Sequence, residues 1–125
     1  MSSRAYKFGM LKIPVSDIQK SARFYEKKLG FRLEFVAPEY GWAQMQAGEI
    51  PVALYQPGKG GGKRQIGGSV DFHLSLAGNE FDQVAKQMGE EGLLVEDRIH
   101  QGADGTTFIE IHDPDRNELK VFAAS

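Results

Sequence analysis

The chain has 125 residues, enough for one domain with a buried core, and its apolar and charged fractions of 41% and 26% are ordinary for a globular protein. Its net charge is −2, and its Lys and Arg residues are scattered among Asp and Glu, which argues against a nucleic-acid partner. The absence of cysteine excludes disulfides, thiolate zinc sites and a Cys nucleophile. We find no signal-peptide pattern and no membrane-length apolar run, so we expect a cytoplasmic protein without a membrane partner.

The first predicted element is a strand followed directly by a helix. Residues 8–15 alternate between apolar positions and an opposite face that carries Met10 and Lys12, which is typical of a half-buried strand. Ser16 stands three residues before Gln19, a capping-box spacing that predicts the start of a helix.

The predicted helix has an apolar stripe, and three strands are expected after it. Its stripe consists of Ile18, Ala22, Tyr25 and Leu29, and Gly30 stands where a left-handed C-terminal cap is expected. The strands are predicted at 31–35, 42–47 and 52–56.

The second half of the chain predicts the same order of elements. Residues 70–76 alternate, with His73 on the face opposite Phe72 and Leu74. Asn79 is the predicted cap of a second helix, which Gly92 ends. The helix carries Phe81, Val84, Ala85 and Met88 on its apolar stripe, and strands are predicted at 93–97, about 106–112 and 118–123.

The chain therefore reads as one domain, 1–125, made of two tandem modules. "GFRLEF" at 30–35 and "GLLVED" at 92–97 occupy the same place in each copy, half the chain apart. Module one covers about 6–57 and module two about 69–125. The Gly-rich stretch 58–68 between them lacks the Gly-Lys-Ser/Thr that opens a helix in a phosphate-binding loop, so it is interpreted as a flexible connection.

Three stretches carry a family resemblance: "IPVSDIQKSARFYEKKLGF" (13–31), "FHLSLAGNEFDQV" (72–84) and "DPDRNELKVF" (113–122). They resemble the vicinal-oxygen-chelate superfamily, which contains glyoxalase I, bleomycin-resistance proteins, fosfomycin-resistance enzymes and extradiol dioxygenases. The resemblance implies an α+β fold in which two βαβββ modules form a cup-shaped, eight-stranded mixed sheet with helices outside. It also implies a ligand in the cup and a homodimer.

The resemblance also implies positions for a divalent metal, and this sequence keeps one of four. The first-strand position is Met10, the fifth-strand position is His73 and the last-strand position is Lys120, while "VALYQ" lacks the remaining carboxylate. A thioether is a soft donor, and a protonated amine has no lone pair and repels a cation. We therefore expect no metal cofactor; if a metal binds, His73, Glu118 and Glu110 are the candidate ligands.

The candidate ligand-binding residues are those expected to face the cup. They are His73, Lys120, Met10, Lys12, Phe122, Glu118 and Trp42. His73 is the best candidate for a catalytic residue, and the alternative is a structural histidine held by a neighbour. Aromatic residues, among them Tyr40 and Tyr55, suit a planar ligand or, alternatively, a packed core or interface.

Charge and turn residues lead to further expectations. Lys12 and Lys120 are candidates to converge and favour an anionic ligand; alternatively, both extend into solvent. His100 and His112 are expected at exposed strand ends. Asp113 and Asn117 are interpreted as turn formers.

These observations favour a binding protein similar to bleomycin-resistance proteins, which holds a small, anionic or aromatic molecule without the family metal. One alternative is a metal-dependent lyase, isomerase or dioxygenase with a rearranged site around His73. Another is a dimeric regulatory or scaffold module.

Overall fold

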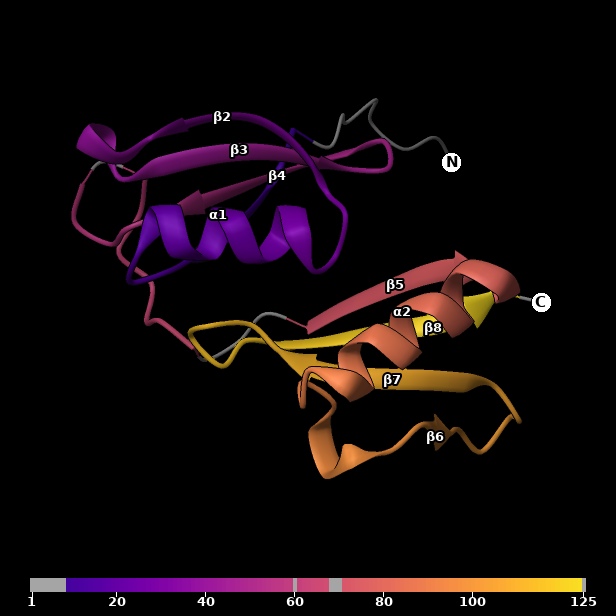
Figure 1. Ribbon diagram of the computed structural model, residues 1–125. Helices are drawn as coiled ribbons and strands as arrows, with labels where there is room; N and C mark the ends of the chain where they lie inside the picture. Colours follow the sequence, from indigo (N-terminus) through magenta and orange to yellow (C-terminus); the bar gives the residue numbers. More distant parts are fainter. Residues whose placement is uncertain (1–8, 60, 68–70, 125) are drawn as a thin grey trace, which may run out of the picture.

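A computed structural model of the protein describes residues 9–59, 61–67 and 71–124. It contains two modules, each with a helix packed on one face of a four-stranded sheet (Figure 1). The first module comprises β1 (Leu11–Pro14), α1 (Ile18–Lys27), β2 (Arg32–Ala37), the 3-10 turn η1 (Pro38–Tyr40), β3 (Trp42–Ala47) and β4 (Ile50–Tyr55). The second comprises β5 (Asp71–Ala77), α2 (Gly78–Glu90), the 3-10 turn η2 (Val95–Asp97), β6 (His100–Gln101), β7 (Thr107–His112) and β8 (Glu118–Ala124). The predicted α+β fold of two βαβββ modules is confirmed.

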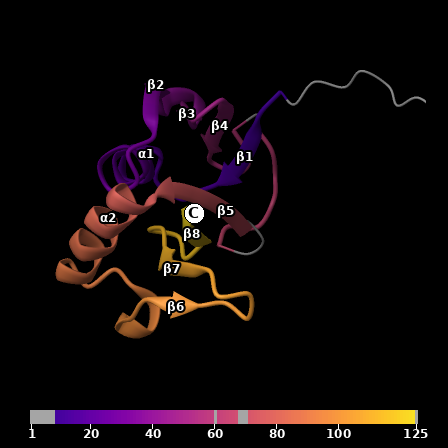
Figure 2. The same cartoon turned by 90° about the vertical axis from the view of Figure 1, so that its right-hand side faces the viewer.

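Equivalent strands occupy equivalent places in the two sheets. The strand orders are β1-β4-β3-β2 and β5-β8-β7-β6, and β1–β4 and β5–β8 are the parallel pairs. The eight observed strands are thus divided between two separately hydrogen-bonded sheets, in place of the single eight-stranded sheet that was predicted. Strands β1 and β5 are both edge strands, and Figure 2 shows them where the two sheets meet, with α1 and α2 on the same side of the sheets.

The helix-facing sides of both sheets contribute to one apolar core. Six of the eight residues in the predicted helix stripes are buried there: Ile18, Ala22 and Tyr25 from α1 and Phe81, Ala85 and Met88 from α2. The other two, Leu29 and Val84, are partly buried against this core. The sheets add residues including Ile13, Val15, Met45, Leu54, Ile109, Ile111, Leu119 and Val121. Each fully buried large apolar side chain stabilises the fold by roughly 1.5–3 kcal/mol, so the alternation in the strands fixes which face is covered.

Both predicted helix caps are wrong by one or two residues. The N-cap of α1 is Asp17, whose carboxylate accepts the backbone N–H of Lys20 at 3.0 Å. Ser16 instead donates its hydroxyl to Asp115 of the second module at 2.6 Å. The second helix begins at Gly78, before Asn79, and its start has no side-chain cap. Neighbouring Ser, Asp and Asn residues all suit a cap, so sequence alone does not choose among them.

The predicted strand at 93–97 is also wrong. Leu94 forms a single isolated bridge with Ile111, and the chain then turns through η2. Glu96 and Asp97 have φ values of 60° and 53°, which take the backbone out of a sheet. Strand pairing resumes at β6, beyond the predicted range. The predicted glycine at the end of α2 is confirmed: the helix ends at Glu90, and Gly92 has a left-handed φ of 70°.

A buried hydrogen-bond network joins α1 to the turn between β7 and β8. The Tyr25 hydroxyl donates to Asp113 at 2.7 Å, and Asp113 also accepts the backbone N–H groups of Asp115 and Asn117 and the Asn117 amide, all within 2.9 Å. Burial raises the pKa of Tyr25 far above its usual range, and the negative charge of Asp113 adds to this. The turn roles predicted for Asp113 and Asn117 are confirmed, and the network fixes the two modules against each other.

Within the described residues, no helix combines the length and apolarity that crossing a membrane requires.

Candidate functional site

The open face of the second sheet gathers most of the predicted site residues. Strand register places His73 of β5 beside Lys120 of β8, and Lys120 beside Glu110 of β7. The next row on the same face pairs Ser75 with Phe122 and Phe122 with Phe108. The intervening residues of these strands face the core. Alternation along three adjacent strands therefore builds one continuous exposed surface.

An aromatic row crosses this face from β5 to β6. The rings of His73 and Phe122 are stacked, with centroids 3.9 Å apart and planes 13° apart. Phe122 and Phe108 lie 5.0 Å apart, and Phe108 and His100 are stacked at 5.3 Å. The two longer separations lie within the 4.5–7 Å range of favourable aromatic pairs, and His73 and Phe122 lie closer still. We call these four side chains, His73, Phe122, Phe108 and His100, the aromatic row.

Two members of the aromatic row depart from the sequence expectations. His100 was expected to be exposed at a strand end, but 13% of its side chain is accessible and its ring lies against Phe108. Phe108 was not a candidate, because its neighbours depend on the register between β7 and β8. Alternation alone predicts that Phe108 shares a face with Glu110, which was a weak available signal.

Lys120 is the cation of this face and has no ion pair among the described residues. Its register neighbour Glu110 is on the adjacent strand, but no carboxylate oxygen of the described residues lies within 4.0 Å of the Lys120 ammonium. Glu118, two residues earlier, is 3.8 Å from the His112 ring nitrogen instead. The Lys120 side chain is half-buried beside the aromatic row, so its ammonium is available to a ligand.

The donor set on this face does not fit the divalent metal that the sequence resemblance implies. Lys120 stands in register between His73 and Glu110, and Glu118 is beside His112 rather than His73. Across residues 9–59, 61–67 and 71–124, no three His, Asp or Glu side chains are grouped closely enough to hold an ion. A protonated amine between two potential ligands repels a cation at contact distance.

The predicted site residues of the first module lie on its own sheet. Met10, directly before β1, is 38% exposed. Trp42 is half-buried in β3, and its indole N–H donates to Gln44 at 3.4 Å. The Lys12 ammonium donates to the carbonyl of Gly61 and lies 5.4 Å from the centre of the Tyr55 ring. Lys12 and Lys120 therefore belong to different sheets, and the chain does not bring them together on one hydrogen-bonded surface.

Part of the connection between the modules is packed rather than flexible. A Cβ on Gly61 would lie 2.7 Å from the Cβ of Tyr55, and one on Gly62 would lie 2.8 Å from its ring. Glycine is needed for such a close approach. Tyr55 is consequently 2% exposed, while Tyr40, also considered as a wall residue, is 69% exposed. Tyr55 is thus closed to a ligand on the first sheet.

Comparison with known proteins agrees with this architecture. Residues 7–121 match the family model of the Glyoxalase/Bleomycin resistance protein/Dioxygenase superfamily. The uncharacterized protein YraH of Bacillus subtilis (strain 168) is 23% identical over 124 residues, which cover 93% of this chain and 97% of YraH.

Solved structures show the same fold. The lactoylglutathione lyase from Agrobacterium tumefaciens superposes with a TM-score of 0.77 at 16% identity, covering 98% of this chain and 96% of the lyase. A member of the glyoxalase/bleomycin resistance protein/dioxygenase superfamily from Sphaerobacter thermophilus DSM 20745 gives a TM-score of 0.71 at 24% identity, covering 95% of this chain and 98% of its own.

Proposed function

The chain belongs to the Glyoxalase/Bleomycin resistance protein/Dioxygenase superfamily, and from this premise we propose that it binds a small planar molecule on the open face of its second sheet, without a metal ion. The ligand stacks on the aromatic row and directs an anionic or other hydrogen-bond-accepting group toward Lys120. The stacked geometry of the aromatic row is the observation that carries the proposal.

An exposed row of aromatic rings favours a flat ligand for a physical reason. A planar apolar molecule gains burial from such a surface and, because the rings of the row face one another, edge-to-face contact, about 0.5–1.5 kcal/mol per aromatic pair beyond the burial itself. Half-buried Phe122 and Phe108 lie at the centre of the row and supply most of this surface. His73, at its exposed end, offers a ring nitrogen that can donate or accept a hydrogen bond.

Lys120 supplies the charge preference. A half-buried ammonium with no carboxylate oxygen of the described residues within 4.0 Å gains more from an anion than a solvated lysine does. Glu110 on the neighbouring strand weakens that preference without cancelling it, because it makes no contact ion pair with Lys120. The same ammonium disfavours a divalent cation, which supports binding without the family metal.

The proposal is tested with 2-naphthoate as the probe, followed by its own fluorescence, and with uncharged 2-naphthamide as its matched partner. Phe122→Ala is expected to weaken both probes by about three- to tenfold, because it removes a stacking partner. Lys120→Met is expected to weaken naphthoate about two- to fivefold and to leave naphthamide unchanged. Glu110→Gln is expected to strengthen naphthoate.

Tyr40→Ala is the control, since Tyr40 is an exposed aromatic residue on the other module. Naphthoate binding that is unaffected by Phe122→Ala, or lost equally in Tyr40→Ala, would place the ligand elsewhere. Equal loss of both probes in Lys120→Met would show that the lysine acts through packing and not through charge.

A further inference from the structure

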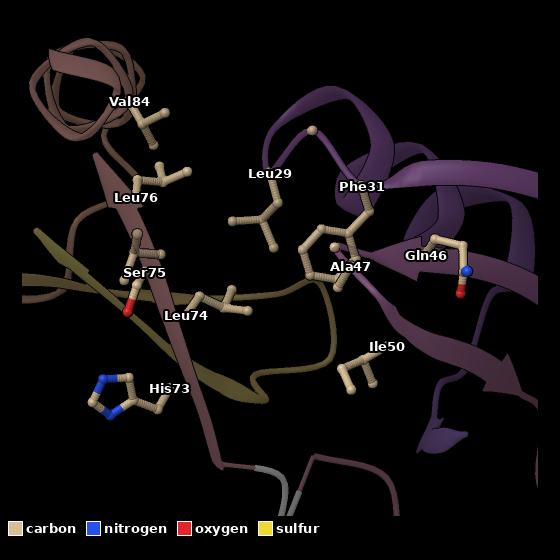
Figure 3. Close-up of a pocket in the computed structure, with 13 residues that line it drawn as sticks. Leu29, Phe31, Gln46, Ala47, Ile50, His73, Leu74, Ser75, Leu76 and Val84 are labelled. Atoms are coloured by element: carbon tan, nitrogen blue, oxygen red, sulfur yellow. The ribbon is translucent and has the colours of Figure 1, made fainter. Parts of the chain in front are cut away.

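A pocket lies between the two modules, on the other side of β5 from the aromatic row. Its volume is about 370 Å³. One wall comes from the connection between α1 and β2 and from the β3–β4 hairpin, and the other comes from β5 and α2 (Figure 3). The side chains directed into it include Leu29, Phe31, Ile50, Leu74, Leu76 and Val84.

The interior of this pocket is apolar although polar residues border it. His73 and Ser75 alternate with Leu74 and Leu76 along β5, and Figure 3 shows the His73 ring directed away from the apolar side chains. Gln46, on the opposite wall, also extends away from the centre of the pocket. No Lys, Arg, Asp or Glu is among the described residues that line it.

The pocket is held open by the way in which the modules are joined. Its two walls belong to separately hydrogen-bonded sheets. The Tyr25–Asp113 hydrogen bond and the ion pair of Lys28 with Glu91 join the two modules that carry these walls. Ile50 remains 39% exposed at the rim, which leaves a path for entry.

Size and polarity together define the class of occupant. An apolar cavity of about 150 Å³ already takes up benzene, and ligand sites generally begin near 300 Å³. A charged group would lose its hydration without gaining a partner, at a cost of several kcal/mol. The outer edge of β5 has no strand partner among the described residues, so its backbone can satisfy one hydrogen-bonding group.

We propose that this inter-module pocket binds a small, uncharged, largely apolar molecule of about the size of indole, independently of the aromatic row. The site does not depend on the function proposed for the aromatic row. Leu74 and Leu76 enter it from the core side of β5, whereas the ring of His73, which borders the pocket, is directed away from it toward the aromatic row.

The test follows the Leu and Val methyl groups of the full chain by NMR during titration with indole. The methyl signals of Leu74, Leu76 and Val84 are expected to shift saturably. Val84→Phe fills the pocket from α2 and Ala47→Leu fills it from β3, so each is expected to weaken indole at least about tenfold. A variant is folded if it keeps the methyl chemical-shift dispersion and the thermal midpoint of the wild type. Because the two substitutions lie on opposite walls, the second still tests the proposal if the first unfolds the protein.

Controls separate this site from the aromatic row. In Phe122→Ala, the apparent indole affinity measured from the Leu74 and Leu76 methyl shifts is expected to stay within about twofold of the wild-type value. Indole-3-acetate, which carries a charge, is expected to bind the pocket at least about tenfold more weakly than indole. The proposal is overturned by an absence of saturable shifts, by shifts that persist in both filling variants, or by loss of the shifts in Phe122→Ala. It is also overturned if Val84→Phe halves the mass in solution, because a second copy then covers the pocket.

Discussion

Removal of one hydroxyl group, in Tyr25→Phe, tests how the two modules are held together. The ring of Tyr25 is fully buried in the core, so the substitution keeps its apolar contacts and removes the 2.7 Å hydrogen bond to Asp113. Hydrogen bonds to charged groups contribute about 1.5–3 kcal/mol. Asp113 keeps its three bonds to Asp115 and Asn117, so the loss is not expected to exceed this range. Urea unfolding at pH 7 measures it directly.

The same variant should change the pH dependence of stability. Burial raises the pKa of Tyr25 well above its ordinary value of about 10. Above pH ~10 the Tyr25 hydroxyl loses its proton in the unfolded chain but keeps it in the folded chain. The free energy of unfolding therefore falls as the pH rises, by about 1.4 kcal/mol per pH unit. Tyr25→Phe lacks this term. The difference in free energy of unfolding between wild type and variant should therefore shrink steadily above pH ~10.

Tyr40→Phe is the matched control, because Tyr40 is 69% exposed and its hydroxyl makes no hydrogen bond among the described residues. It should alter neither the stability at pH 7 nor the alkaline slope. The reasoning is refuted if Tyr25→Phe lies within about 0.5 kcal/mol of wild type, or if the difference between them stays constant through the alkaline range.

Two further substitutions address the local structure. Gly61→Ala should destabilise the protein by about 1–3 kcal/mol in chemical unfolding, because the added Cβ would overlap Tyr55. Gly9→Ala, whose Cβ would lie in open space, is the control and should change the stability little. Equal effects of the two substitutions would show that the connection is not packed against Tyr55. Asp17→Ala should lower the free energy of unfolding by about 1 kcal/mol, because it removes the N-cap of α1. Asn79→Ala should lower it much less, because Asn79 caps no helix. If Asn79→Ala lowers the thermal midpoint more than Asp17→Ala does, the assigned helix starts are wrong.

The sequence predicted the parts of the fold that depend on periodicity. Alternation located most of the strands, and most of the apolar stripe of each helix is buried as expected. It failed at 93–97, where three apolar residues, Leu93 to Val95, suit either a strand or a buried turn. The left-handed conformations of Glu96 and Asp97 produce a turn and not a strand. Neither residue type predicts such a conformation, whereas a glycine would have indicated it.

The candidate site was harder to predict because it depends on cross-strand register. Alternation placed His73, Lys120 and Phe122 on the same side of their strands, but only the pairing of β5, β8 and β7 shows which rings stack. The contribution of Phe108 is visible only then. Lys12 illustrates a different limit: its partner, the carbonyl of Gly61, lies 49 positions away in the chain and carries no sequence signal.

The most direct test of the central claim is the calorimetric titration of 2-naphthoate into metal-free protein. The protein is first dialysed against a chelator, and elemental analysis verifies that the metal has been removed. The titration is then repeated after addition of Zn²⁺, Ni²⁺ or Mn²⁺. Stacking on the aromatic row beside Lys120 predicts saturable binding to the metal-free protein, with an affinity that none of the three ions raises. Binding that appears only after a metal is added, and that is lost in His73→Ala, would contradict it.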